Sequence, residues 1–224
     1  MAEHINSKFE EELVAIRDRL MQMGTQVEHM VQQSVAALQG GSEQLARQVI
    51  AADVEVDRDE VELDEACLET IARRQPTASD LRFLTLALKV VTDLERIGDL
   101  AVNISERAIE LQNWPAGKEF EEIAAMAGSA STMLSQALTA FVNRDDVLAE
   151  SILAMDDTVD QTYRAFFERL LGAARSAGSP DPLIALLFAG KSLERVADHA
   201  TNIAEMVVFM IRGQDIRHPS ARRG

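Results

Sequence analysis

The sequence predicts an all-α fold made of two tandem, pseudo-symmetric three-helix bundles, with six long helices in total. Composition is the first reason, because 47% of the 224 residues are hydrophobic and only 4% are aromatic. Residues that favour helices are abundant, and the β-branched and aromatic enrichment typical of strands is missing. An internal repeat is the second reason. The phrase LERIGDLAVNISE begins at Leu94, and LERVADHATNIAE, identical at eight of thirteen positions, begins at Leu193.

The repeat extends beyond this phrase. VIAADVEVD from Val49 matches ILAMDDTVD from Ile152 at an offset of 103 residues, and the offset falls to 99 at the LER phrase. A unit of this length that occurs twice indicates duplicated bundles rather than a solenoid. We expect the first three-helix repeat over residues 1–113, the second over 117–214, and a basic, flexible tail over 215–224.

The first two helices follow from apolar spacing and from a break between them. Apolar residues recur three and four positions apart from Leu13 to Met30, which makes a seam on one helix face. The segment QGGSEQ interrupts this pattern. Ser42 is then predicted to cap a second helix over residues 43–73.

The third helix begins after a second break, RRQPTASD. Pro76 is predicted to end the preceding helix, and Ser79 or Asp80 to cap the next one. The seam of this third helix runs from Leu94 to Leu111 with the same spacing of three and four.

The second repeat shows the same three helices after the separator QNWPAGKE. Asn143 is predicted to cap its middle helix, with Asp145 and Asp146 in the first turn, where the helix dipole favours negative charges. The segment GSPDP begins the last helix and places Pro182 at an opening position. Short connections make neighbouring helices antiparallel, so each repeat should form its own bundle.

Charge and cysteine content exclude several classes of protein. The formal net charge of −15 argues against a nucleic-acid-binding protein and against a basic membrane-binding face. The lone Cys67 cannot form an internal disulfide, which fits a reducing cytosol. The start of the chain lacks an apolar signal segment, and the apolar run MVVFMI is too short for direct membrane insertion. We therefore expect a cytoplasmic protein.

The acids of the repeated phrase fall on the helix face opposite the seam. At about 100° per residue, Asp99, Asn103 and Glu106 lie within about 80° of Glu95. The second copy repeats this stripe. The predicted stripes comprise Glu95, Asp99, Asn103 and Glu106; Glu194, Asp198, Asn202 and Glu205; Asp53, Asp57, Glu60 and Asp64; and Asp156 with Asp160.

Two interpretations of these stripes stay open. Acids opposite a seam are ordinarily a solvated face. However, like charges at i and i+4 destabilise a helix by a few tenths of a kcal/mol, and both repeats retain them. If the second and third helices pack at about 8–10 Å, the two stripes can converge on cations. Oxygen ligands favour hard ions such as Mg²⁺, Mn²⁺ or iron, but periodicity alone does not decide whether the stripes face each other.

The segments RQPTASDLRFLTLALKVVTDLERIGDLAVNISERA and LERVADHATNIAEMVVFMIRGQDIRH closely resemble the PhoU family, the accessory regulators of bacterial phosphate-specific transport. The resemblance covers nearly the whole chain and implies a PhoU-like fold with carboxylate-bound divalent or trivalent metal ions: iron, zinc, Mn or Mg. The implied ligands are Asp53, Asp57, Glu95 and Asp99 in one bundle and Asp156, Asp160, Glu194 and Asp198 in the other, with Asn103, Glu106, Asn202 and Glu205 continuing the stripes.

The second repeat departs from the first at one end of its stripe. Tyr163 and Phe167 stand where the first repeat has Glu60 and Asp64, so the two sites are expected to differ in occupancy. His199 lies about 140° from Glu194 and is expected to contact solvent or a neighbouring helix rather than a metal. Arg96 and Arg195, which follow the first glutamate of each phrase, are expected to form ion pairs.

The resemblance also implies a non-catalytic regulator that silences transport and starvation signalling when phosphate is plentiful. The implied partners are the phosphate transporter ATPase subunit, a membrane sensor histidine kinase and a second copy in a homodimer, with localisation at the inner membrane through partners. A net charge of −15 makes direct phosphate capture unfavourable. The alternatives are a helical scaffold or adaptor without metal dependence, and a di-iron carboxylate enzyme, although the Glu-x-x-His pairs of that class are missing.

Overall fold

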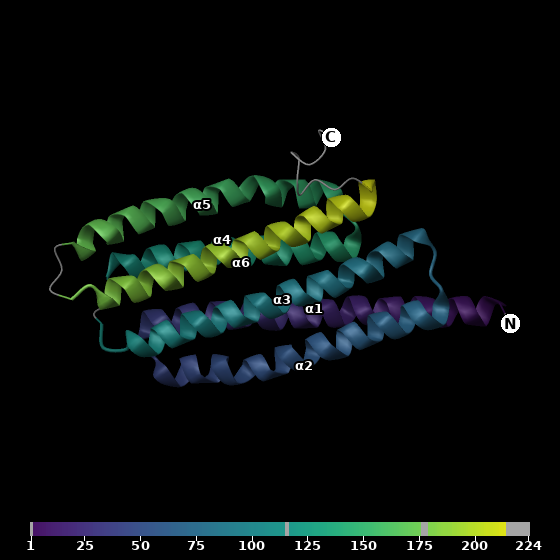
Figure 1. The fold of residues 1–224 in the computed structure, drawn as a ribbon, viewed down its shortest axis with the longest axis horizontal. Coiled ribbons are helices and arrows are strands. Elements are labelled where there is room, and N and C mark those ends of the chain that lie inside the picture. Colours follow the sequence, from purple (N-terminus) through teal and green to yellow (C-terminus); the bar gives the residue numbers. More distant parts are fainter. Residues whose placement is uncertain (1, 115–116, 176–178, 214–224) are drawn as a thin grey trace.

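Six helices and no strand make up the part of the chain that this computed structural model describes, residues 2–114, 117–175 and 179–213. The all-α prediction is confirmed (Figure 1). The predicted tail at 215–224 lies outside the described residues. The helices are α1 Ala2–Gly40, α2 Glu43–Arg74, α3 Ala78–Glu110, α4 Lys118–Asn143, α5 Asp146–Ala174 and α6 Asp181–Arg212.

The two bundles lie side by side and share one core. Helices α1, α2 and α3 form the first bundle, and α4, α5 and α6 form the second (Figure 1). Helix α1 packs on α4 and α3 packs on α6, whereas α2 and α5 lie on the outside. The buried side chains of both bundles form a single hydrophobic cluster. The outer helices α2 and α5 therefore each pack on only their own bundle, along the faces where the acids lie.

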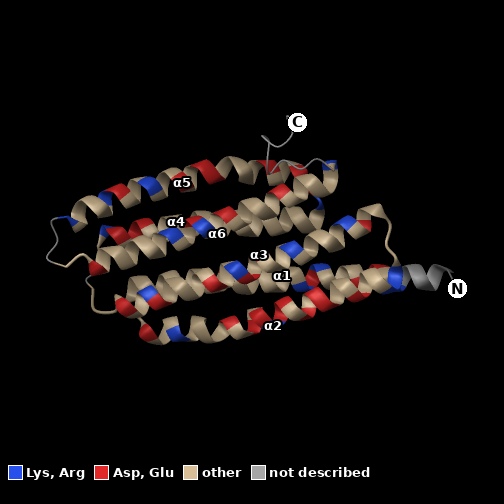
Figure 2. Cartoon of the chain, viewed as in Figure 1, with Lys and Arg blue, Asp and Glu red and all other residues tan. Residues whose placement is uncertain are grey.

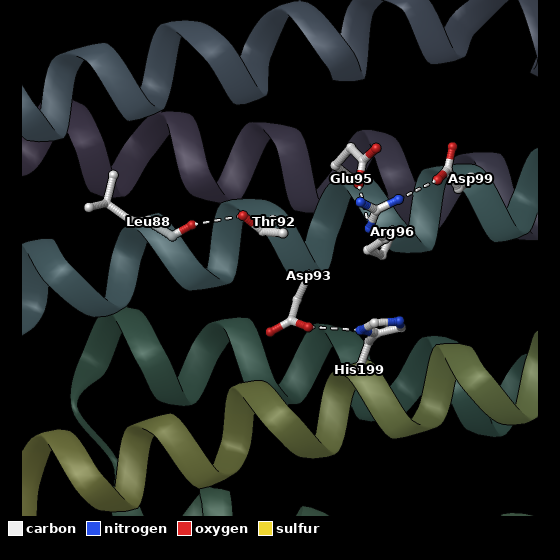
Figure 3. A network of polar contacts seen from close by, with 7 residues as sticks. All are labelled: Leu88, Thr92, Asp93, Glu95, Arg96, Asp99 and His199. Carbon is white, nitrogen blue, oxygen red and sulfur yellow. Dashed lines mark hydrogen bonds and ion pairs between the residues drawn. The ribbon is translucent and has the colours of Figure 1, made fainter.

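Two contacts between helices illustrate how closely the bundles approach. Gly24 of α1 lies against Leu138 of α4, and a Cβ atom at that glycine would overlap the leucine side chain. At the contact between α3 and α6, His199 of α6 and Asp93 of α3 are largely buried. The His199 Nδ1 atom lies 2.8 Å from the Asp93 Oδ1 atom (Figure 3). The prediction that His199 contacts a neighbouring helix is confirmed.

The helix caps agree with the sequence at one position and differ at two. Ser42 caps α2, and its hydroxyl accepts a hydrogen bond from the Leu45 amide at 3.3 Å. Helix α3 begins earlier than expected, with Thr77 as the N-cap, so the prediction of Ser79 or Asp80 is wrong. Asp80 instead lies in the first turn and accepts a hydrogen bond from the Thr77 hydroxyl at 3.3 Å.

The predicted cap at Asn143 is also wrong, because Asn143 is the last residue of α4. Arg144 adopts a left-handed conformation with φ 55°, which reverses the chain and leaves Asp145 as the cap of α5. The Asp145 carboxylate accepts from the amides of Val147 at 3.1 Å and Leu148 at 2.9 Å. A charged acceptor satisfies two free amides there and complements the helix dipole.

Gly24 allows a direct test of the contact between the bundles. We expect Gly24→Leu to lower the free energy of unfolding by about 1–3 kcal/mol relative to Gly128→Leu, because only the first substitution overpacks a buried contact. Gly128, on α4, is the matched control, since nothing lies within 4 Å of a Cβ built there. Both variants gain similar helix propensity over glycine. Urea unfolding followed by circular dichroism measures the difference, and equal stability of the two variants would contradict close packing of α1 on α4.

Candidate metal sites

The acids of α2 lie against α3. Gly98 of α3 faces Asp53, and a Cβ built at that glycine would lie only 2.9 Å from the Asp53 Oδ1 atom and 3.3 Å from Val56 Cγ1. The glycine therefore makes room for the carboxylate, one residue before Asp99. Acidic residues follow α2 along much of its length (Figure 2). The facing arrangement that periodicity left open is present in the first bundle, and we call the group of Asp53, Asp57, Glu60, Asp64, Glu95 and Asp99 the first acidic groove.

The carboxylates of the first acidic groove repel one another across the two helices. Burial raises the pKa of Asp53 to about 6, and the charges of Asp57 and Asp99 act in the same direction. Burial also raises the pKa of Glu95, and Asp99 adds to this effect. Glu60 of α2 belongs to the same network, since burial raises its pKa and Asp99 of α3 contributes. These groups hold protons more readily than isolated acids because their negative charges are close together and partly removed from water.

Within the described residues, Arg96 is the cation that pairs with acids of the first acidic groove. Arg96 lies 3.3 Å from Glu95 and 3.2 Å from Asp99 (Figure 3), so the prediction of an ion pair at Arg96 is confirmed. The Glu95 atom in this ion pair is Oε2, which is buried and faces Arg96 without hydrogen-bond geometry, and the Oδ1 atom of Asp64 is buried without accepting a hydrogen bond. A buried carboxylate oxygen that accepts no hydrogen bond lowers the free energy of unfolding. The first acidic groove therefore has unused capacity for a cation.

The second bundle gathers its acids more tightly. Asp160, Glu194 and Asp198 each offer an oxygen within 4.8 Å of the others, a spacing that one metal ion can bridge. Among the described residues this is the one group of three or more potential ligands with that spacing. Partial removal from water and the charge of Glu194 raise the pKa of Asp198. Asp156 completes what we call the second acidic groove, and it accepts a hydrogen bond from the Thr201 hydroxyl at 3.1 Å.

A lysine distinguishes the second acidic groove from the first. Lys191 of α6 forms an ion pair with Glu194, and its Nζ atom lies 5.5 Å from the centre of the Tyr163 ring. The first repeat has Thr92 at the position of Lys191. Lys191 is not among the residues predicted from the sequence, although its spacing of three residues from Glu194 could have indicated the pair. The second groove is thus shorter and partly neutralised.

The four residues that extend the stripes are less closely associated with the grooves. Asn103 and Glu106 are exposed on α3, and Glu106 pairs with Arg107 at 3.3 Å. Asn202 and Glu205 are half-buried on α6, beyond Asp198. The geometry favours the ten acids of the two acidic grooves over these four residues.

Oxygen atoms are the donors in both grooves, and this donor set fits a hard cation. Carboxylates on facing helices, some of them buried without hydrogen-bond donors, match the chemistry of Mg²⁺, Mn²⁺ or iron. A bound cation would remove the repulsion that raises the carboxyl pKa values. The arrangement can bind and be stabilised by metal ions. Burial raises the pKa of the Cys67 thiol to about 12, so this thiol is protonated at neutral pH.

Comparison with known proteins identifies the family. A family model described as the PhoU domain matches the chain twice, over residues 20–108 and 123–207. The chain belongs to the PhoU family. A PhoU homolog of Pseudomonas putida, named as a phosphate-specific transport system accessory protein, is 37% identical over 225 residues, which cover 100% of this chain and 88% of that protein. The Escherichia coli K12 protein of the same name is 35% identical and covers 96% of this chain and 90% of its own length.

Solved structures of PhoU proteins share the fold. The crystal structure of PhoU from Pseudomonas aeruginosa superposes with a TM-score of 0.88 at 37% identity, over 92% of this chain and 100% of that one. A phosphate transport system regulatory protein PhoU from Streptococcus pneumoniae gives a TM-score of 0.87 at 26% identity, over 93% and 99% of the two chains. These relatives are named as accessory or regulatory proteins and not as enzymes, in agreement with the non-catalytic expectation.

The raised pKa of Asp53 predicts an unusual pH dependence in the metal-free protein. Because its folded-state pKa of about 6 lies above the value of an unfolded aspartate, the folded state binds more protons between about pH 4 and pH 6. The contribution of Asp53 to the free energy of unfolding is therefore present at low pH and is lost as the pH rises through 6. We expect Asp53→Asn to stabilise the metal-free protein at pH 7.5 by roughly 1 kcal/mol, after allowance for solvent screening.

Denaturant unfolding between pH 4.5 and pH 8 in the presence of a chelator measures this effect. The matched control is Glu55→Gln, which removes an exposed acid from the same helix outside the groove. Identical dependence of stability on pH in the two variants would show that the pKa of Asp53 is not raised in the folded protein.

Proposed function

We propose that this member of the PhoU family is a metal-dependent, non-catalytic regulator that reduces phosphate transport and phosphate-starvation signalling when phosphate is plentiful. It acts through the transporter ATPase subunit and a membrane sensor histidine kinase, as a homodimer in the cytoplasm that reaches the inner membrane through these partners. The names of the relatives, which are accessory proteins of phosphate-specific transport systems, support the link to phosphate. The structure contains no helix with the length and apolar character needed to cross a membrane, within the residues it describes.

The facing carboxylates carry the metal-dependent part of the proposal. In the first acidic groove, Asp53 of α2 reaches the backbone of α3 at Gly98, and Asp64 keeps a buried oxygen without a donor. In the second, Asp160, Glu194 and Asp198 already lie within bridging distance of one ion. A solvated acidic face would have no reason to hold like charges together in both repeats, since the repulsion lowers stability.

Phosphate sensing is best placed in the partners. Phosphate is an anion, and a chain with a net charge of −15 and two acidic grooves would repel it. The carboxylates of the two grooves would hold metal ions, and a bound cation would reduce this repulsion locally. The groove carboxylates would then present a less negative surface to a partner, whereas the partner reports on phosphate.

The two alternatives differ from this proposal in specific ways. A scaffold without metal dependence requires that neutralising the grooves leaves regulation intact. A di-iron enzyme requires Glu-x-x-His pairs that project into a bundle core. Here the acids lie outside the hydrophobic cluster of buried residues, and His199 is engaged with Asp93 on the other bundle.

A complementation experiment tests the function. Deleting the gene is expected to leave the starvation response active, or to raise phosphate uptake, in phosphate-rich medium. The wild-type gene and a Glu55→Gln/Glu65→Gln control, which removes two exposed acids of α2, should restore silencing. The groove variant should fail to restore silencing, because its grooves cannot hold a cation. This variant combines Glu95→Gln, Asp99→Asn, Glu194→Gln and Asp198→Asn.

Reporter expression and phosphate uptake are the measurements, with protein level checked by immunoblot. Uptake and reporter activity equal to wild type after deletion would contradict the regulatory role. Full silencing by the groove variant at normal protein level would support the metal-independent scaffold instead.

A further inference from the structure

One end of the α5–α6 pair exposes large apolar side chains. Phe167 and Leu171 lie one turn apart on α5 and are 39% and 40% exposed, and Ile184 and Phe188 lie one turn apart on α6 and are 42% and 58% exposed. Tyr163 lies next to Phe167, with 6.2 Å between the ring centres. We call these five residues the apolar patch. Contiguous apolar surface of this kind marks interaction sites more often than isolated exposed residues do.

The apolar patch spans both helices and contains a depression. Lys191 follows Phe188 by three residues and therefore shares its face of α6. Its Nζ atom lies over the Tyr163 ring of α5, at 5.5 Å. Around this contact is a pocket of about 250 Å³ lined by Tyr163, Arg164, Phe167, Glu168 and Lys191. Its volume suits one large side chain of a partner.

The first repeat shows that the fold does not require these apolar residues. Its helices α2 and α3 occupy the same places in their bundle as α5 and α6, yet four of the five counterpart positions are polar. An exposed phenylalanine contributes little to core burial, so folding alone does not account for the difference. The counterparts of Tyr163, Phe167, Ile184 and Phe188 are, in that order, Glu60, Asp64, Thr85 and Lys89.

Basic side chains border the apolar patch, and one of them has no acidic partner in the described part of the chain. Arg195 lies one turn beyond Lys191 and is exposed, whereas its counterpart Arg96 pairs with two acids of its own bundle. The prediction of an ion pair at Arg195 is therefore wrong within the described residues. The side chain of Arg164 is 75% exposed and forms an ion pair with Asp160 at 3.5 Å. The border of the patch can accept carboxylates from outside.

These charges distinguish among possible occupants. A net charge of −15 opposes approach to an anionic lipid surface. A two-fold contact between two copies would place each patch against itself and bring the same basic side chains together. A partner with apolar side chains and a carboxylate matches both the patch and its border.

We propose that the apolar patch docks an amphipathic helix of a partner protein that presents apolar side chains and at least one Asp or Glu. An apolar side chain of this helix enters the pocket beside Tyr163 and Phe167. An Asp or Glu of the same helix pairs with Arg195. A carboxylate that also reaches Lys191 competes with Glu194 for the lysine, which links docking to the second acidic groove. The docking itself does not depend on a bound metal.

Site-specific photo-crosslinking in cells identifies the docked segment. Phe188 is replaced by a photo-reactive phenylalanine analogue, and in a control chain the same analogue replaces Leu68, which is 57% exposed in the first repeat. Mass spectrometry then identifies the peptides crosslinked from each position. The proposal expects a helix with an apolar face and an acidic residue to be captured from position 188 and not from position 68.

Binding of a synthetic peptide of the captured segment to the purified full chain completes the test. Phe188→Ser and Phe167→Ser should each weaken binding about tenfold or more, as expected for central apolar contacts. Arg195→Gln should weaken it about threefold and reduce its salt dependence. Leu68→Ser, the matched loss of an exposed apolar side chain, should leave the dissociation constant unchanged, and circular dichroism confirms that each variant folds.

Four results would overturn the proposal. The crosslink from position 188 could join two copies of this chain, or no crosslink specific to that position could form. The peptide could bind Phe188→Ser as tightly as wild type. The purified chain could bind phosphatidylglycerol vesicles through the patch, with binding lost in Phe188→Ser, which would assign the surface to a membrane.

Discussion

Carboxylates on facing helices repel one another in both bundles, and the shared hydrophobic core has to offset this repulsion. Asp53 is held against α3 at Gly98, where a side chain would displace it, and its pKa of about 6 reflects the local cost of that position. The chain tolerates this cost because α1, α3, α4 and α6 share one hydrophobic cluster that anchors both bundles. Helices α2 and α5 each pack only against their own bundle. The charge state of the grooves therefore affects the stability of the two helices with the fewest packing partners.

Duplication produced two related grooves with different surroundings. The first is open and rich in acids, with Arg96 as its internal cation. The second is closed at one end by Tyr163 and Phe167 and partly neutralised by Lys191. Both grooves gather carboxylates, and the second also adjoins the apolar patch. The contact between Lys191 and Glu194 connects this patch to the second groove.

The seams and breaks in the sequence were sufficient to predict six helices, because apolar spacing is a local property of each segment. They could not establish that Asp53 faces α3, since periodicity gives the angle of a residue on its helix and not the rotation of that helix against its neighbour. The cap of α5 was missed because Asn143 and Asp145 are both good capping residues, and the left-handed turn at Arg144 decides between them. The hydrogen bond between His199 and Asp93 across the two bundles depends on how the repeats pack together, which no pattern within one repeat encodes.

Metal content measured together with thermal stability tests the central claim most directly. Wild type, Glu95→Gln/Asp99→Asn, Glu194→Gln/Asp198→Asn and the control Glu55→Gln/Glu65→Gln would be compared with chelator and with Mn²⁺, Mg²⁺ or iron. We predict that metal at about 100 times its dissociation constant stabilises wild type and control by about 2.7 kcal/mol per site. Each groove variant should lose the metal of its own bundle and, without metal, melt slightly above wild type. Unchanged metal content in both groove variants, or melting temperatures insensitive to metal, would contradict the account.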